Sequence, residues 1–112
     1  MTMTVVAITE TQSATLKEIL EAADTELEAR LEFDGEWDED EAHEFEQLRA
    51  RLTPLLKATP TMVSRTNTPL LTELYCLARE ATLNHPSPEY PVEAQDAARA
   101  RYDAFAAEFN LG

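Results

Sequence analysis

The chain has 112 residues, a formal net charge of −13, 44% hydrophobic side chains and a single cysteine, Cys76. This length fits one domain, the hydrophobic content excludes a disordered chain, and one cysteine excludes an internal disulfide bond. No apolar run approaches the roughly 20 residues that span a bilayer, and the first residues lack the basic region of a signal peptide. Composition therefore predicts a single cytoplasmic domain, residues 1–112, with no membrane association.

The negative charge is concentrated near the start of the chain. Residues 1–45 hold fourteen carboxylates and two basic groups, whereas residues 46–112 hold eight and seven. The densest stretch, residues 32–46, has nine acids and no basic side chain. Such a block repels itself, so it is either a solvated face or a surface for a basic partner. Salt adaptation or a GC-rich source would also enrich acids, although salt adaptation usually spreads them over the whole surface.

The first expected element is a short β-prone run at residues 4–8, an edge strand or docked segment within an N-terminal tail, residues 1–14. Thr15 and Glu18 fit a capping box and predict the start of the first helix. Apolar residues then recur at three- and four-residue steps, and the helix should end by Gly35. This stripe consists of Leu16, Ile19, Leu20, Ala23, Leu27 and Leu31.

A second helix start follows at Asp38, a good N-cap residue with Glu41 three positions later. Trp37 and Ala42 have the spacing of a hydrophobic staple, and Pro54 should end or kink the helix. Its buried stripe should be Ala42, Phe45, Leu48 and Leu52.

Residues 58–68 form a linker rich in Thr and Pro, in which Met62 and Val63 should pack onto the bundle. Thr68 followed by Pro69 is typical of a helix N-cap and first position, and predicts a third helix. The apolar stripe of that helix is Leu70, Leu71, Leu74, Leu77, Ala78 and Ala81.

Three prolines in residues 85–91 interrupt the chain before a fourth helix from about Val92. Amphipathic helices with short connections predict an all-α fold, a small antiparallel four-helix bundle. It should consist of two helical hairpins, an acidic one at 15–57 and a second at 69–110. The side chains expected to be mostly buried are Leu20, Leu27, Phe45, Leu48, Leu74, Leu77 and Phe105.

The acidic run does not fit a calcium loop. An EF-hand loop that begins at Asp34 needs Gly at its sixth position and Glu at its twelfth, where the chain has Glu39 and Phe45. A loop that begins at Glu32 places Trp37 at the glycine position. We therefore expect no structured calcium site.

Other chemistry is equally unsupported. Asp40 and His43 have the i, i+3 spacing of di-iron bundle ligands, but His85 lacks an acidic residue three positions before it. Cys76 lies between apolar helix residues, where a small apolar filler is expected. The arginines are too few and too mixed with acids for direct nucleic-acid binding. We expect no catalytic residues, no metal and no cofactor.

Trp37 has two interpretations: a packing residue in the staple, or an interface anchor within a charged rim. The hypothesis we favour is a non-enzymatic protein-binding module that inhibits or regulates a partner by covering its basic, nucleic-acid-binding surface. Phage or mobile-element inhibitors and immunity proteins use this logic. The alternative is a structural or assembly subunit, including a homodimer, in which the acids serve solubility. The expected partner-binding residues are Glu28, Glu32, Asp34, Glu36, Trp37, Asp38, Glu39, Asp40, Glu41 and Glu44.

Overall fold

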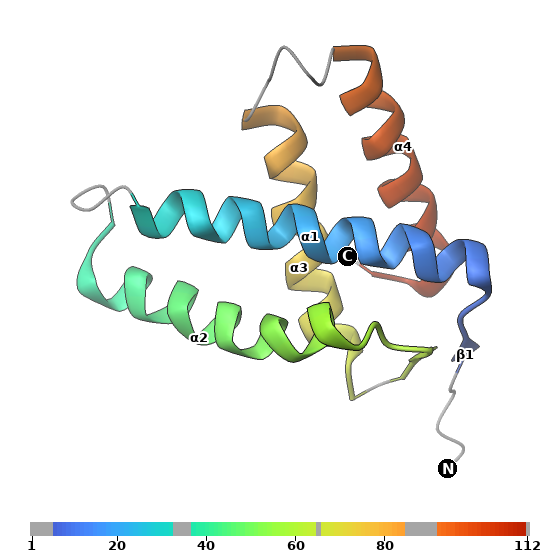
Figure 1. Ribbon diagram of the computed structural model, residues 1–112, viewed down its shortest axis with the longest axis horizontal. Coiled ribbons are helices and arrows are strands. Elements are labelled where there is room, and N and C mark those ends of the chain that lie inside the picture. The colour runs from blue at the N-terminus through green and yellow to red at the C-terminus, as the bar shows by residue number, and fades with distance from the viewer. Residues whose placement is uncertain (1–5, 33–36, 65, 85–91, 112) are drawn as a thin grey trace.

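The computed structural model describes residues 6–32, 37–64, 66–84 and 92–111 (Figure 1). Within these ranges the chain forms four helices and two very short strands, which confirms the expected small all-α bundle with a short N-terminal β segment. In chain order the elements are β1 (Val6–Ala7), α1 (Glu10–Glu32), α2 (Glu39–Lys57), β2 (Met62–Val63), α3 (Thr68–Asn84) and α4 (Val92–Phe109).

Helix α1 is the centre of the bundle. In Figure 1 it runs alongside α2 as one antiparallel hairpin, while α3 and α4 form a second hairpin that crosses it. Helix α1 contacts all three other helices, most extensively α3, whereas α2 makes extensive contact only with α1. The arrangement therefore has a shared core around α1, α3 and α4, with α2 at its edge.

Helix α1 begins earlier than the sequence pattern predicted. The Thr9 amide donates to Gln12 Oε1 at 2.8 Å and the Gln12 amide donates to Thr9 Oγ1 at 3.2 Å, which is a reciprocal capping box. The prediction of a start at Thr15 was wrong, because this hydroxyl instead donates to the Thr11 carbonyl at 3.3 Å. No glycine or proline separates the two candidate boxes, so extension to the earlier one adds backbone hydrogen bonds without a penalty.

The N-terminal segment pairs with the linker after α2. Val6 pairs with Val63 and Ala7 with Met62 in an antiparallel register, and the Ile8 amide donates to the Thr61 carbonyl at 2.9 Å. Val63 is buried as expected, but Met62 is 51% exposed. The difference follows from the strand period of two, which places neighbouring side chains on opposite faces.

Helix α2 has the predicted N-cap but a thinner buried face than expected. Pro54 lies inside the helix, which continues to Lys57. Leu52 is its one fully buried residue, and Phe45 and Leu48 are partly buried and pack against the edge of the core. The thin buried face follows from the position of α2, which has extensive contact with α1 alone.

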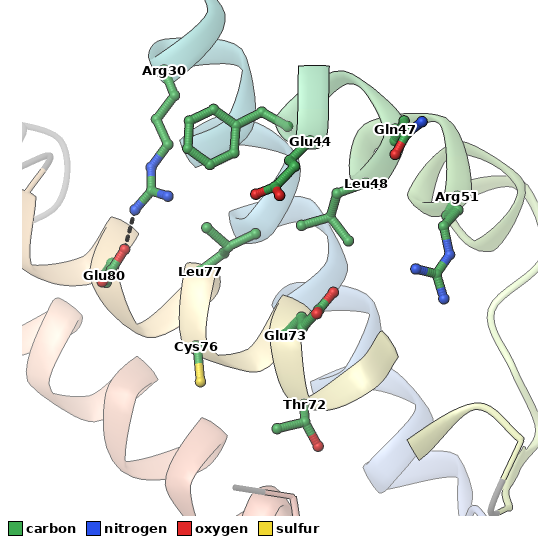
Figure 2. A pocket seen from close by; sticks show the side chains of 11 residues that line it. Arg30, Glu44, Gln47, Leu48, Arg51, Thr72, Glu73, Cys76, Leu77 and Glu80 are labelled. Atoms are coloured by element: carbon green, nitrogen blue, oxygen red, sulfur yellow. Dashed lines mark hydrogen bonds and ion pairs between the residues drawn. The ribbon is translucent and has the colours of Figure 1, made fainter. Parts of the chain in front are cut away.

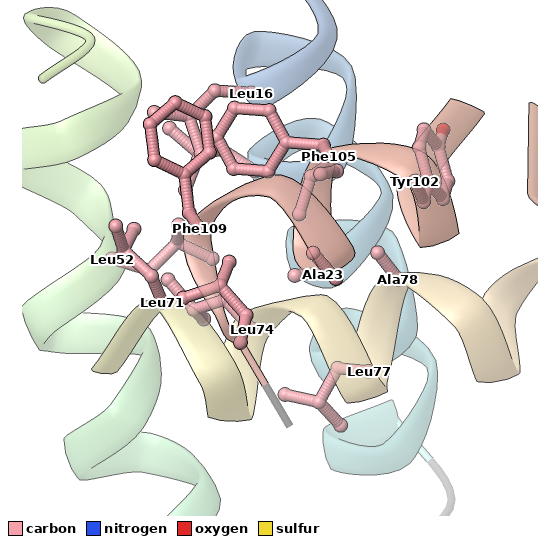
Figure 3. Packing of buried hydrophobic residues seen from close by; sticks show 14 of the residues in the cluster. Leu16, Ala23, Leu52, Leu71, Leu74, Leu77, Ala78, Tyr102, Phe105 and Phe109 are labelled. Carbon is pink, nitrogen blue, oxygen red and sulfur yellow. The ribbon is translucent and has the colours of Figure 1, made fainter. Parts of the chain in front are cut away.

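The second hairpin supplies most of the remaining core (Figure 3). Leu71, Leu74 and Ala78 of α3 pack with Phe105 and Phe109 of α4 and with the buried face of α1. The phenyl rings of Phe105 and Phe109 have centroids 4.7 Å apart. The predicted burial of Leu20, Leu27, Leu74, Leu77 and Phe105 is confirmed.

Two local features of the second hairpin differ from expectation. Cys76 is exposed, so the prediction of an apolar filler was wrong; it lies two residues after buried Leu74, which turns it about 200° away from the core. Asn67, rather than Thr68, occupies the N-cap position of α3, because its carbonyl accepts from the Leu71 amide at 2.9 Å. The Thr68 hydroxyl instead donates to the Ser64 carbonyl at 2.6 Å.

Helix α4 ends in a left-handed residue. Asn110 has φ of 56°, and the Leu111 amide donates to the Ala106 carbonyl at 2.8 Å. This six-to-one bond is that of a Schellman motif, with Leu111 and Ala106 both buried as its apolar contact. The motif turns the end of the chain back into the core.

Candidate functional site

Most of the expected partner-binding acids gather at one end of the first hairpin. Glu28 and Glu32 lie in the last turns of α1, Asp38 caps α2, and four further acids lie in the first turns of α2, which the antiparallel hairpin brings to the same end (Figure 1). All seven described members are exposed. We call this set the acidic end: Glu28, Glu32, Asp38, Glu39, Asp40, Glu41 and Glu44. Asp34 and Glu36 lie outside the described residues.

The helix start explains why so many carboxylates fit there. The Asp38 side chain accepts a hydrogen bond from the Glu41 amide at 2.8 Å, so the predicted N-cap is confirmed. Acids in the first turn face the positive end of the helix dipole, which offsets part of their mutual repulsion. The offset is incomplete at Glu41: local desolvation, and then the charge and hydrogen bond of Asp38 and the charge of Glu44, raise the pKa of its carboxyl.

Few of these acids are neutralised by a neighbouring cation. The Arg49 guanidinium contacts Asp24 at 3.0 Å and Glu28 at 3.9 Å. Among the described residues, every member of the acidic end other than Glu28 forms no ion pair. The surface therefore carries several exposed negative charges at one corner of the molecule.

Beside the acidic end, Arg30 joins three helices. Its Nε lies 3.0 Å from Glu26 on α1, and its Nη2 pairs with Glu80 on α3. The guanidinium also lies 5.5 Å from the ring centroid of Trp37 and 5.1 Å from that of Phe45 on α2. Because Glu26 is only 4% exposed, this cation compensates a buried negative charge.

Trp37 packs into this corner. Its ring meets Phe45 edge to face with centroids 5.1 Å apart, and the predicted staple with Ala42 stays a prediction. The indole Nε1 is buried and has no hydrogen-bond acceptor within the described ranges. These contacts favour the packing interpretation, and the role of Trp37 as an interface anchor stays a prediction.

The sequence reading missed Arg30 and Glu26. A signal was present, since Glu26 falls on the apolar stripe between Ala23 and Leu27 and stands four residues before Arg30. A charged residue on a core-facing stripe needs a partner. The contribution of Glu80, fifty residues away in the chain, had no local signal.

A hollow of about 580 Å³ lies next to Arg30, between α2 and α3 (Figure 2). Leu48 and Leu77 point toward each other across it. We call it the α2–α3 groove. Its lining comprises Arg30, Glu44, Phe45, Gln47, Leu48, Arg51, Thr72, Glu73, Cys76, Leu77 and Glu80. A second hollow of about 650 Å³ lies between α1, α3 and α4; five of its twelve lining residues are alanines, and the Glu18–Arg101 ion pair also lines it.

The described residues contain no group of three or more His, Cys, Asp or Glu side chains arranged to hold a metal ion. His43, the histidine considered for a metal, lies 3.0 Å from the Gln47 amide nitrogen through its Nε2. Asp40 of the same pair is exposed at the acidic end. The predictions on catalysis and cofactors stay predictions.

None of the helices, over the part of the chain that the structure describes, is both long and apolar enough to cross a membrane. Comparisons with protein families, with curated proteins and with solved structures find no match to this chain. Function is therefore inferred from the geometry and charge of the described residues.

Proposed function

We propose that this chain is a non-enzymatic module that binds a basic surface of another protein through its acidic end. The observation that carries the proposal is the gathering of exposed carboxylates from two helices at one corner, most of them without an ion-pair partner among the described residues. Evenly distributed charge would serve solubility equally well, so the concentration of charge needs a further explanation.

The target that suits this surface is a nucleic-acid-binding groove. Carboxylates held on a helix start at Asp38–Glu41 and on the neighbouring α1 end form a fixed array of negative charge, comparable in kind to the phosphates of a duplex. A Lys/Arg-rich groove would attract it over a distance and associate rapidly at low salt. The chain would then act as an inhibitor or regulator of a nucleic-acid enzyme, as cytoplasmic immunity or anti-defence proteins of phages and mobile elements do.

The use of the arginines supports a protein target over direct nucleic-acid binding. Arg30, Arg49, Arg79, Arg99 and Arg101 all form ion pairs with carboxylates of the same chain. Cations committed in this way are poorly placed to contact phosphates, which need free Lys or Arg side chains.

The test is affinity capture at low salt with two matched variants. The acid-end variant carries Glu39→Gln, Asp40→Asn and Glu41→Gln, and keeps Asp38 to preserve the helix cap. The control variant carries Glu10→Gln, Glu93→Gln and Glu108→Gln, which removes three exposed charges elsewhere, two of them also from first helix turns.

Wild-type chain and control variant should capture the same basic nucleic-acid-binding protein, and duplex DNA should displace it. The acid-end variant should not capture it. Equal capture by all three chains would contradict the proposal, because the charge block would then be only a solvated face.

Assembly is the second candidate, and one observation favours it. Val6 and Met62 are 43% and 51% exposed on the two strands of a sheet that has no third strand among the described residues. Exposed apolar strands are sites at which another chain can pair. Light scattering after gel filtration would reveal a dimer, and Met62→Lys should then dissociate it while the acid-end variant leaves it intact.

A further inference from the structure

The α2–α3 groove exists because α2 packs on α1 and diverges from α3. Extensive contact joins α2 to α1 and α1 to α3, but does not join α2 to α3. The side chains of α2 and α3 that face this gap are therefore not fully covered. Phe45 and Leu48 are partly buried, and Leu77 is 7% exposed at the floor.

The rim of the groove carries three acids and two arginines. Glu44 comes from α2, and Glu73 and Glu80 come from α3 (Figure 2). Arg30 at one end is already held by Glu26 and Glu80. Within the described part of the chain, Glu44 and Glu73 form no ion pair. Arg51 is the rim cation that forms none there, so the rim keeps a negative balance.

The two walls have the period of a helix. On α2 the lining residues Glu44, Leu48 and Arg51 follow at four- and three-residue steps. On α3 the acids Glu73 and Glu80 are seven residues apart, which is about 10.5 Å along the axis at 1.5 Å per residue. An apolar floor between an acidic α3 wall and a mixed α2 wall, over about two turns, fits one face of another helix with hydrophobic anchors at i, i+3, i+4 and i+7.

We propose that the α2–α3 groove docks an amphipathic helix of the partner protein, with leucine-like side chains on its inner face and Lys or Arg along its flanks. The proposal rests on the proposed function, because the same basic partner would reach both surfaces. Glu44 belongs to the acidic end and to the groove rim, so the two surfaces are continuous. The negative charge of the groove rim favours a basic helix over an acidic or neutral one.

The single cysteine makes the groove directly observable, since Cys76 lines it and is exposed. An environment-sensitive fluorophore attached to Cys76 would report occupancy. The probes are two synthetic 18-residue helical peptides that share leucines at i, i+3, i+4 and i+7, one with lysine flanks and one with glutamate flanks. The lysine peptide should change the fluorescence saturably, and the glutamate peptide should not.

Two groove variants and one control locate the binding. Glu44→Gln with Glu73→Gln should weaken lysine-peptide binding roughly two- to tenfold, the range expected for two exposed charge contacts. Leu48→Ala should weaken it about tenfold or more if this side chain meets an apolar anchor. The control pair Glu93→Gln and Glu108→Gln removes as many charges from α4 and should change little. Circular dichroism checks that each variant keeps its helices.

The outcomes separate this inference from the proposed function. Equal weakening by the groove pair and the control pair would show nonspecific charge attraction and overturn the groove. Fluorescence that changes with the concentration of the chain alone would show that a second copy occupies the groove, which also overturns it. If capture of the partner requires the Glu39–Glu41 carboxylates but is unchanged by Leu48→Ala and Glu73→Gln, the proposed function stands and the groove inference fails. If capture of the partner is the same with every variant, both the proposed function and the groove inference fail.

Discussion

Helices α1 and α2 have similar lengths, 23 and 19 residues, but opposite relations to the core. Helix α1 buries residues along most of its length and contacts every other helix, whereas α2 fully buries Leu52 alone. The less a helix is needed for the core, the more of its surface is free to carry charge. Stability therefore depends mainly on α1, α3 and α4, and under the proposed function recognition would depend mainly on α2.

The largest expected difference is between a core leucine and a groove leucine. Leu74 is fully buried against the α1 side of the core, so Leu74→Ala should lower the free energy of unfolding by about 2–5 kcal/mol. Leu48 is only partly buried on α2, so Leu48→Ala should cost about 1 kcal/mol or less. Urea denaturation measures both. Equal losses of unfolding free energy for the two variants would show that α2 is as much a part of the core as α3.

Arg30 tests how α2 is held at the edge of the core. Arg30→Ala leaves buried Glu26 without this cation and removes the contacts to Phe45 and Glu80, which should cost about 2–3 kcal/mol. Arg30→Lys keeps the charge but not the planar stacking, and should cost less. A loss below about 0.5 kcal/mol on Arg30→Ala would mean that Glu26 is compensated elsewhere.

Tyr75 tests the interface between α3 and α4, away from the acidic end. Its hydroxyl donates to Asp103 at 2.5 Å, and desolvation together with that hydrogen bond and charge raises the pKa of Tyr75 to about 12. A raised pKa means that the folded state holds the proton more tightly. This stabilisation is complete below the unfolded pKa near 10 and is lost as pH rises through about 12. Tyr75→Phe should cost about 1 kcal/mol at pH 7 and should flatten the decline in stability between about pH 10 and 12.

The smallest expected effect is at Glu41. Because the pKa of its carboxyl is raised, the folded state binds this proton more tightly, and folding gains as pH falls through the raised value. Glu41→Gln should therefore stabilise the protein slightly at pH 7 and low salt. The benefit should disappear below the ordinary glutamate pKa of 4.5, where the wild-type carboxyl is also neutral. Thermal unfolding at pH 7 and pH 3.5 gives the sign, and destabilisation at pH 7 would show that the helix dipole outweighs the repulsion.

Features with local causes were predictable from sequence. The Asp38 cap, the apolar stripe of α1 and the start of α4 at Val92 each follow from spacing within a few residues. The start of α1 was misplaced because Thr9–Gln12 and Thr15–Glu18 satisfy the same capping pattern. The capping pattern alone therefore does not decide which of the two threonines begins the helix.

Features that depend on how helices are placed were not predictable. The partial exposure of Phe45 and Leu48 follows from the absence of extensive contact between α2 and α3. The Arg30–Glu80 pair joins residues fifty positions apart, and the groove beside it is formed by two helices with no extensive contact between them. Periodicity identifies which face of a helix is apolar, but not how completely a neighbour covers it.

The most direct test of the division between core and recognition surface is the salt dependence of association. The basic protein captured by the wild-type chain would be mixed by stopped flow with the wild-type chain, the acid-end variant and the control variant at 50 and 500 mM NaCl. The Debye length falls from roughly 14 to 4 Å over this range, so association of the wild-type chain and the control should slow sharply. The acid-end variant should associate slowly at low salt and respond weakly to added salt, with unchanged helicity. The same rate and the same salt dependence for all three chains would contradict the account.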